Sequence, residues 1–386
     1  AGALRLPAQQ RTELAEAARR QRRAEHQRAA HQRGARTASR EFGEIPDTAK
    51  FHGRQEELRQ LTHWIAKEGC RVAAVLGIGG IGKTALMARA VEALRGRFEY
   101  VYWCPLYNAP PIAEVLCECI PFLSGQERAD LPGDLASRIA LLLRALREHR
   151  CLLVFDNIES VLADGEQSGQ YRAGFEGYGL LLRRISEIKH QSCLALTSRE
   201  RLQELAELSG TPVRALELRG LTPGDGQSLL AEAGLHGSAE AWAELVARYA
   251  GNPLALKLIA GPVCTLFRGD IAAFLRAGVV ALGGVHDLCA QQVAGLSALE
   301  HALLRWLAIE REPVTLETLR ADVVPAPSSR ALLEALDALC RRYLIEVRGG
   351  LYALQPVILE YLTDQLLVQA GAVLASHAVI KAEAKE

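Results

Sequence analysis

Residues 77 to 84 have the sequence Gly77-Ile78-Gly79-Gly80-Ile81-Gly82-Lys83-Thr84, which is the pattern G-x-x-x-x-G-K-[ST] of a phosphate-binding loop. The apolar run 71–76 precedes this loop, and the run 84–94 that follows it has the apolar spacing of a helix. A glycine-rich loop between a strand and a helix lets successive backbone N–H groups point into one concave site. The stretch therefore predicts an α/β fold that holds a phosphate group at the end of a central strand.

The side chains at the end of the loop indicate which phosphate compound it binds. Lys83 would reach the β and γ phosphates of a nucleotide as a point charge, and the Thr84 hydroxyl would join the oxygen ligands of Mg²⁺. The helix that continues through Ala85 would direct the positive end of its dipole at the same phosphates. A chance match to the pattern is the alternative, but the flanking strand and helix disfavour it. We therefore expect ADP or ATP with Mg²⁺, bound by residues 77–85.

Around the loop, the chain alternates between short apolar runs and longer amphipathic runs. The expected strands are 71–76, 100–104, 151–155, 193–197 and 213–218, and the expected helices between them are 84–94, 112–122, 136–148 and 180–188. Apolar strands separated by helices are typical of a parallel sheet covered on both faces. In such a sheet a ligand binds at the carboxyl ends of the strands, where the phosphate loop lies. Residues 47–219 are therefore predicted to form the nucleotide-binding domain.

Two other expected strands end in polar residues that would face this ligand. Asp156 follows the run 151–155, so the sheet would place it beside Thr84, where it could hold Mg²⁺ directly or through water. Asn157 comes next, and an amide cannot accept a proton as a carboxylate can. Arg199 follows the run 193–197 and could contact a γ phosphate. The structural alternatives are a turn-forming Asp156 and a surface Arg199; we expect instead that Asp156, Asn157 and Arg199 form the catalytic edge, with Thr84 and Asp156 as metal ligands.

From residue 220 onward the strand signals stop and helical signals follow one another. Thr222-Pro223-Gly224-Asp225 resembles a helix N-cap with proline at the first helical position, and further helices are expected over 239–250 and 253–267. The sequence thus predicts an all-α lid domain over residues 220–290.

The remaining residues have the signals of a winged helix. Ser297 and Glu300 form a capping box that begins a helix to residue 309, and helices near 316–321 and 329–342 follow. Two β-favouring runs, 343–347 and 351–354, are joined by a glycine-containing turn and precede a helix over 357–368. We therefore predict a winged-helix domain over residues 291–370 and a C-terminal tail over 371–386.

Length and composition favour a globular protein of several domains. The 386 residues suffice for two or three compact units, and the hydrophobic content of 49% can build their cores. No apolar stretch approaches the length needed to cross a bilayer, and the N-terminus is rich in arginine without an apolar signal core. The nine cysteines mostly lie singly within apolar runs, as expected for buried thiols in a reducing compartment. We predict a cytoplasmic protein with no membrane partner.

The first forty residues differ chemically from the rest of the chain. They hold ten arginines against Glu13, Glu16 and Glu25, a net charge of plus seven in a chain whose formal net charge is zero. Few apolar residues accompany these charges, so residues 1–46 are predicted to be a basic helical or disordered arm. Contact with nucleic acid or with an acidic partner is the functional alternative.

Together, these motifs and their order resemble the NB-ARC class of STAND signal-transduction P-loop ATPases, which contains plant disease-resistance proteins and the apoptotic protease-activating factor. The resemblance spans residues 47–370. It rests on Phe51-His52-Gly53-Arg54, the phosphate loop, Phe155-Asp156-Asn157, Thr197-Ser198-Arg199, Gly251-Asn252-Pro253-Leu254-Ala255-Leu256 and the winged helix. Bacterial members that carry WD-repeat propellers are the most similar, down to Leu354-Gln355-Pro356-Val357 and Glu360-Tyr361-Leu362.

The resemblance implies roles that the motifs alone leave unassigned. The adenine would be bordered by Phe51, His52, Gly53 and Arg54 and by Pro253 with its neighbour Leu254. Arg199 would sense the γ phosphate. Family members rest with ADP clamped between the nucleotide domain and the winged helix, and ATP opens them for assembly.

Two positions depart from this family pattern. Gln355 stands where many relatives have a winged-helix histidine that contacts the ADP phosphate, so the clamp would use a neutral hydrogen bond. Asn157 stands where relatives usually have aspartate, so slow hydrolysis is expected.

The sequence therefore predicts a nucleotide-controlled switch in signal transduction, of a defence or cell-death type. It would be closed with ADP, would self-assemble with ATP, and would depend on effector and repeat-type sensor domains that are missing here or separate. A winged-helix DNA-binding ATPase of the initiator or transcription-regulator type is the alternative. The expected recognition helix 329–342 carries a net charge of only plus one, which disfavours nucleic acid without excluding it. An efficient housekeeping ATPase is a third hypothesis.

Overall fold

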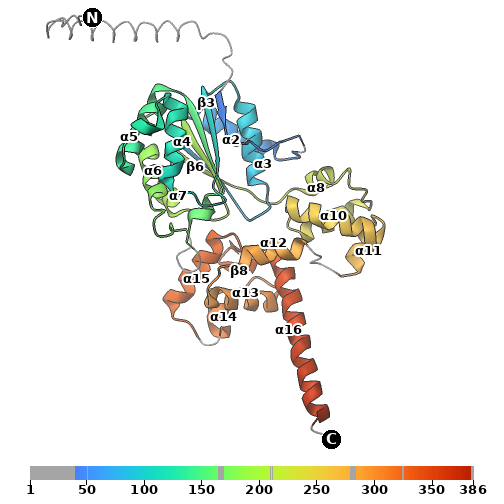
Figure 1. Cartoon of the computed structure of the whole chain (residues 1–386). Helices are drawn as coiled ribbons and strands as arrows, with labels where there is room; N and C mark the ends of the chain where they lie inside the picture. The colour runs from blue at the N-terminus through green and yellow to red at the C-terminus, as the bar shows by residue number, and fades with distance from the viewer. Residues whose placement is uncertain are drawn as a thin grey trace, which may run out of the picture.

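The computed structural model describes residues 40–49, 51–163, 169–208, 210, 212–278, 284–323 and 326–383, with side chains as far as residue 370 (Figure 1). Residues 1–39, which make up most of the predicted basic arm, lie outside the described residues.

A six-stranded, all-parallel sheet forms the centre of the N-terminal domain. Its strands are β1 (Arg40–Phe42), β2 (Val72–Leu76), β3 (Tyr100–Pro105), β4 (Cys151–Asp156), β5 (Cys193–Ser198) and β6 (Val213–Glu217). They lie in the order β1-β3-β4-β5-β2-β6, which puts the phosphate-loop strand β2 between β5 and β6. The five predicted strands are confirmed to within a residue or two.

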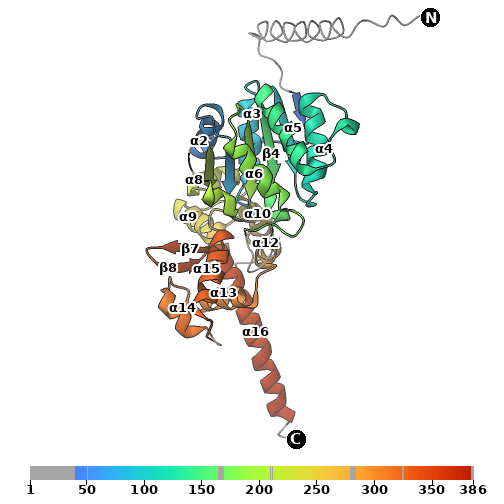
Figure 2. The same ribbon diagram turned by 90° about the vertical axis from the view of Figure 1, so that its left-hand side faces the viewer.

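Side chains alternate between the two faces of this sheet, and each face is covered by its own helices (Figures 1 and 2). Along β2, Ala73 and Val75 pack with α2 (Gln55–Ala66) and α3 (Lys83–Leu94). Val72, Ala74 and Leu76 face the opposite cluster, which is built from α4 (Ile112–Ser124), α5 (Leu135–Glu148) and α6 (Gly177–Glu187). Every residue of β2 is buried, which explains why its sequence is a continuous apolar run and not an alternating one.

The edge strand β1 lies within residues 1–46, which the sequence predicts to be a helical or disordered arm. In the structure, Arg40–Phe42 pairs in parallel with β3, so the sheet begins before the predicted domain start at residue 47. All three β1 residues are exposed, and two of them are charged, so no apolar pattern marked the strand. The Phe42 ring nevertheless stacks on the Tyr102 ring at 5.0 Å between centroids, which fixes the strand at this edge.

Four helices follow the sheet: α8 (Pro223–Leu229), α9 (Ala239–Arg248), α10 (Pro253–Phe267) and α11 (Ile271–Arg276). We refer to them together as the helical domain. The predicted N-cap is confirmed, because the Thr222 side chain accepts the backbone N–H of Asp225 and Pro223 occupies the first turn of α8. Caps at Ser238, Asn252 and Asp270 begin the other three helices.

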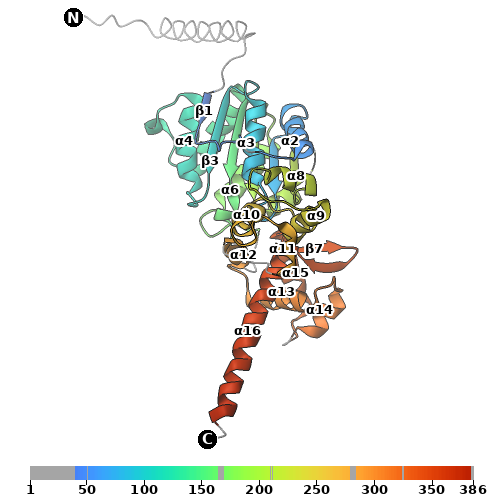
Figure 3. The same ribbon diagram turned by 90° about the vertical axis from the view of Figure 1, so that its right-hand side faces the viewer.

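The C-terminal domain contains α12 (Gly284–Val293), α13 (Ala298–Glu310), α14 (Leu316–Asp322), α15 (Ser329–Arg341), the antiparallel hairpin β7 (Ile345–Arg348) and β8 (Leu351–Leu354), and α16 (Pro356–Glu383). The Ser297 capping box forms as predicted. The order of α13, α14, α15, hairpin and α16 is that of the expected winged helix. Helix α12 spans the predicted boundary at residue 290, and α16 continues past residue 370 and points away from the other helices (Figures 1 and 3).

One buried apolar cluster connects the three domains. It extends from the α2 and α3 face of the sheet through the helical domain to the hairpin and the start of α16. Helix α12 links the two smaller domains, since it packs on both α10 and α16. In the described part of the chain, no helix combines the length and apolar character that a membrane span requires.

Candidate nucleotide site

The phosphate loop adopts the backbone that its glycines were expected to provide. Gly80 has φ +78° and Gly82, which precedes α3 at its N-cap, has φ +99°. Residues with a Cβ rarely adopt such angles. At Gly80 a Cβ would also lie 2.8 Å from the Cβ of Leu254, so the loop and the first turn of α10 approach each other closely.

Lys83 lies over this loop with only 6% of its surface exposed. Its Nζ donates to the carbonyl oxygens of Gly77 at 2.7 Å and Ile78 at 3.1 Å. Burial lowers the pKa of Lys83 to about 8, an effect that nearby Glu159 and Asp156 partly oppose. A cation that has lost most of its water and donates to carbonyl oxygens is well suited to bind phosphate oxygens.

Asp156 ends β4 at the position that the sequence predicted, beside Thr84. Its Oδ1 accepts the hydroxyls of Thr84 at 2.9 Å and Thr197 at 2.5 Å, and its Oδ2 accepts the Tyr107 hydroxyl at 3.3 Å. The carboxylate is buried, at 1% exposure. Thr84 and Asp156 therefore offer a hydroxyl and a carboxylate oxygen together, which fits the hard oxygen ligands that Mg²⁺ prefers. Thr197 and Tyr107 had no assigned role in the sequence analysis, since only the fold brings them to Asp156.

Asn157 turns the chain sharply after β4. Its φ of 64° is left-handed, a conformation that asparagine tolerates better than most residues, and its backbone N–H donates to the Thr197 hydroxyl at 2.9 Å. These contacts give Asn157 a defined structural role. Its place in the catalytic edge stays a prediction.

Arg199 follows β5, as predicted, and forms an ion pair that the sequence did not suggest. Its Nε lies 3.1 Å from Oε1 of Glu159, and its backbone N–H donates to Oε2 of the same residue at 3.2 Å. Glu159 belongs to the 3₁₀ helix Ile158–Val161, directly after Asp156 and Asn157. Burial raises the pKa of Glu159, and the charges of Lys83 and Arg199 lower it.

A cavity of about 160 Å³ lies beside the middle of the loop and is lined by Arg199, the residue expected to contact a γ phosphate. Ile78 and Gly79 form one wall, Glu159 and Arg199 form a second, and Gln292 of α12 forms a third. Gln292 was not singled out in the sequence, yet its Nε2 donates to the Gly79 carbonyl at 3.2 Å. Its Oε1 is buried without a hydrogen-bond partner.

A second cavity, also of about 160 Å³, lies at the other end of the loop and collects most of the residues predicted at the adenine. Phe51, His52, Arg54 and Pro253 line it with Gly82 and Ala85 of the loop and helix, and Asp47, Thr48, Leu221, Leu229 and Lys257 complete the lining. Gly53 is not part of the lining; its φ is +67°, and a Cβ there would lie 2.6 Å from the Asp225 carboxyl carbon.

Arg54, which lines this second cavity, makes hydrogen bonds to two separate segments of the chain. It is 5% exposed, and its Nη2 donates to the carbonyl oxygens of Ile81 and Arg219, both at 2.8 Å. One guanidinium thus joins the phosphate loop to the segment that leads from β6 into the helical domain. Burial lowers the pKa of Arg54.

The helical domain reaches the loop through the start of α10. Leu254 donates its backbone N–H to the Gly80 carbonyl at 3.3 Å. Asn252 donates its Nδ2 to the Gly79 carbonyl at 2.9 Å, and its Oδ1 accepts the N–H groups of Leu254 and Ala255. Asn252 is therefore both the N-cap of α10 and a direct contact to the loop.

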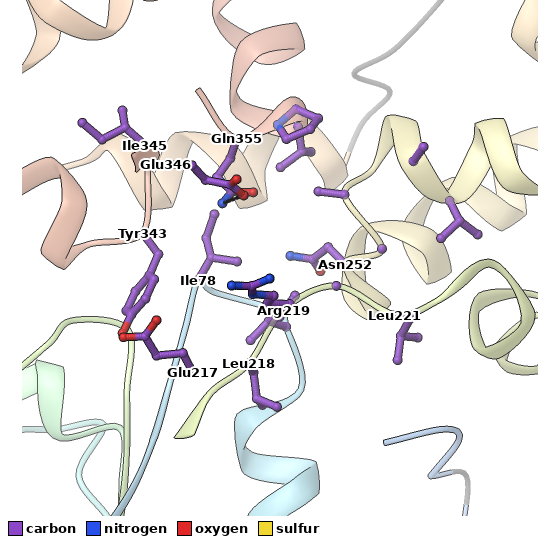
Figure 4. A pocket seen from close by; sticks show the side chains of 18 of the residues that line it. Ile78, Glu217, Leu218, Arg219, Leu221, Asn252, Tyr343, Ile345, Glu346 and Gln355 are labelled. Carbon is purple, nitrogen blue, oxygen red and sulfur yellow. Dashed lines mark hydrogen bonds between the residues drawn. The ribbon is translucent and has the colours of Figure 1, made fainter. Parts of the chain in front are cut away.

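Gln355 lies in a larger cavity of about 730 Å³, bordered by the loop, the segment after β6 and the hairpin of the C-terminal domain. Figure 4 shows Gln355 and Glu346 in the upper part of this cavity, with Ile78, Arg219 and Asn252 beneath them. The Gln355 amide donates to Glu346 at 2.8 Å. The structure thus gives Gln355 a carboxylate partner, while Gln292 is the glutamine that contacts the loop. A contact of Gln355 with a phosphate stays a prediction.

Comparison with known proteins agrees with this site. Residues 54–166 match the NB-ARC domain. Over 360 residues the chain is 43% identical to an uncharacterized WD repeat-containing protein of Nostoc sp. (strain PCC 7120), a match that covers 90% of this chain and 29% of that protein. The chain therefore spans less than a third of this relative's length.

Two solved structures resemble the chain at low sequence identity. A Walker-type ATPase of Pyrococcus abyssi has a TM-score of 0.54 and 15% identity, over 82% of this chain and 98% of that one. A STAND protein of Pyrococcus horikoshii with a tetratricopeptide repeat sensor has a TM-score of 0.43 and 21% identity, over 82% of this chain and 43% of that one. The first of these supports the fold. The part of the chain that carries this phosphate loop, residues 54–166, is therefore identified as an NB-ARC domain.

Proposed function

We propose that this chain is a nucleotide-controlled switch, closed with ADP and opened by ATP. The observation that carries the proposal is the carbonyl oxygen of Gly79. It accepts one hydrogen bond from Asn252 of the helical domain and another from Gln292 of the C-terminal domain. Both smaller domains thus contact the middle of the phosphate loop, where a change of bound phosphate would alter their contacts first.

The residues at the loop fit ADP or ATP with Mg²⁺. The loop backbone and Lys83 would hold the phosphates, Thr84 and Asp156 would supply oxygen ligands to the metal, and the cavity lined by Phe51, His52 and Pro253 would hold the adenine. The bound metal would supply neutralisation of the phosphate charge. Arg54 would join the adenine cavity to the loop, because it lines the cavity and donates to the Ile81 carbonyl of the loop.

A γ phosphate can shift the arrangement only if the open state contacts it better than the closed state does. In the arrangement described here, which the proposal takes as the closed one, Gln292 and Arg199 both line the cavity where that phosphate would lie. The added negative charge would attract Arg199 and compete with the Gly79 contact of Gln292. Because the Asn157 amide cannot act as a base, hydrolysis would be slow, and the ATP-bound protein would last long enough to assemble.

The remaining elements of the proposal concern partners. The chain would assemble with further copies when open, and a repeat-type sensor and an effector would act through other segments or chains. The Nostoc relative is named for its WD repeats, and we propose repeats of this kind as the sensor. A cytoplasmic location, Mg²⁺ dependence and a signalling role in defence or cell death belong to the same proposal.

The charges of α15 favour the switch over DNA binding. Arg330 pairs with Glu334, Arg341 pairs with Asp337, and Arg342, which follows the helix, pairs with Glu200 of the sheet domain. Each of these cations has a carboxylate partner within the protein, so the net positive charge that this helix offers to a phosphate backbone is small.

The test begins with the nucleotide that copurifies with the protein. We expect ADP in a monomer, and a larger mass after exchange into a non-hydrolysable ATP analogue. Lys83→Ala should abolish retention of ADP, whereas Lys67→Ala, which removes an exposed lysine beyond the end of α2, should leave it intact. Near wild-type ADP affinity in the Lys83→Ala protein would overturn the site assignment.

A further inference from the structure

Glu159 and Arg199 form a contact that fixes the direction of the arginine. One carboxylate oxygen accepts the Arg199 backbone N–H and the other pairs with its side-chain Nε. The two carboxylate oxygens of Glu159 therefore bind two donors of Arg199. This contact restricts both the backbone of Arg199 and the direction of its side chain. The Glu159 side chain is 14% exposed, while that of Arg199 is 40% exposed.

The arginine held in this way lies against the phosphate loop. A Cβ built on Gly79 would lie 3.5 Å from both Cζ and Nε of Arg199. The same two side chains line the cavity of about 160 Å³ with Ile78 and Gly79. Because Glu159 engages Nε, the two terminal Nη groups of the guanidinium are the ones left to meet a ligand in that cavity.

We propose that Glu159 is the positioning residue for Arg199, and that it gives the site its ability to distinguish a nucleoside triphosphate from a diphosphate. This inference rests on the proposed nucleotide switch and adds a residue that determines its specificity. Glu159 aligns the guanidinium so that both Nη groups can donate to one phosphate, a bidentate geometry that a freely rotating side chain would adopt only part of the time.

The Glu159 carboxylate also has an electrostatic effect on the cations around it. Lys83 and Arg199 are two cations at one small site, and the charge of Arg199 disfavours the charged form of Lys83. Glu159 acts on Lys83 in the opposite sense. The carboxylate therefore supplies a compensating negative charge beside these two cations.

An alternative role for Glu159 is that of general base in hydrolysis. Each of its oxygens already accepts one donor of Arg199, so only the second lone pair of an oxygen could face water. Positioning and base catalysis differ in their consequences. A base acts only on turnover, whereas a positioning residue changes the relative affinity for the two nucleotides.

The experiment measures the dissociation constants of Mg²⁺-ADP and of a Mg²⁺-bound non-hydrolysable ATP analogue, and compares their ratio among variants. Arg199→Ala should lower the preference for the triphosphate by roughly 10- to 100-fold, the size expected for a hydrogen bond to a charged group. Glu159→Gln should also lower this preference, because the amide has one acceptor oxygen where the carboxylate uses two, one for each Arg199 donor. The double variant should lose no more than Arg199→Ala alone.

The control is Glu187→Gln, which removes the carboxylate of an exposed Arg–Glu pair on α6 and should leave the ratio unchanged. A urea unfolding transition like that of the wild type shows that the Glu159→Gln protein is folded. If Glu159→Gln keeps the wild-type ratio while Arg199→Ala loses it, or if the two losses add in the double variant, the positioning role is overturned and the proposed switch survives. If the wild-type protein binds neither nucleotide, the proposed function itself fails.

Discussion

Asn252 offers a direct test of the contact between the helical domain and the phosphate loop. It is 1% exposed and has two separable roles, because its Oδ1 caps α10 and its Nδ2 donates to the Gly79 carbonyl. Asn252→Ser should keep the cap, since serine is an equivalent N-cap residue, but its short side chain cannot reach Gly79. Asn252→Ala should lose both.

The magnitudes follow from these two roles. Losing the hydrogen bond to Gly79 costs about 0.5–1.5 kcal/mol in Asn252→Ser, and losing the cap adds about 1 kcal/mol in Asn252→Ala. At about 1.4 kcal/mol per factor of ten, local opening should rise roughly 2- to 12-fold in Asn252→Ser and about 30-fold in Asn252→Ala.

Hydrogen exchange followed by mass spectrometry measures this opening. We expect faster exchange in the loop 77–82 and at the start of α10 in both variants, and faster release of bound ADP by a similar factor. Ser238→Ala is the matched control, because it removes the cap of α9 without touching the loop. The reasoning is refuted if Asn252→Ser exchanges like the wild type in both segments, since Asn252 would then be a helix cap alone.

Two further predictions concern Lys83 and Arg54. Because burial lowers the pKa of Lys83 to about 8 and bound phosphates would raise it, ADP affinity should fall by up to about tenfold per pH unit as pH rises above 8. Over the same pH range the ligand-free protein should become more stable, since the lysine still binds its proton in the unfolded state. Calorimetric titration measures the ADP affinity and urea unfolding measures the stability, both from pH 7 to 10. The Lys83→Arg variant should show neither trend. Arg54→Lys should weaken the bonds to the carbonyls at Ile81 and Arg219, because the lysine ammonium lies one bond nearer the backbone than Nη2; we expect a cost of about 1–3 kcal/mol and weaker ADP binding. An Arg54→Lys protein with wild-type melting temperature and ADP affinity would show that the Nη2 contacts are dispensable.

The sheet and its helices could be predicted because their signals are local. The run 151–155 is apolar at every position since β4 is buried on both faces, and Pro253–Phe267 begins at a proline that an asparagine caps. Asp156 could be placed beside Thr84 because parallel strands bring their carboxyl ends to one edge. Strand β1 was missed since it is short, exposed and partly charged.

The amino-acid sequence by itself determined the phosphate loop, the strand ends that face it and the helices with their caps, because each depends on neighbouring residues and a fixed period. Only the tertiary structure decided which side chains contact the loop. Gly79 is bonded by Asn252 and Gln292, which lie 173 and 213 residues further along the chain, and Glu159 meets Arg199 across two strands. Such contacts depend on how separate domains pack, and a hydrogen bond between distant residues leaves no periodic pattern in either segment.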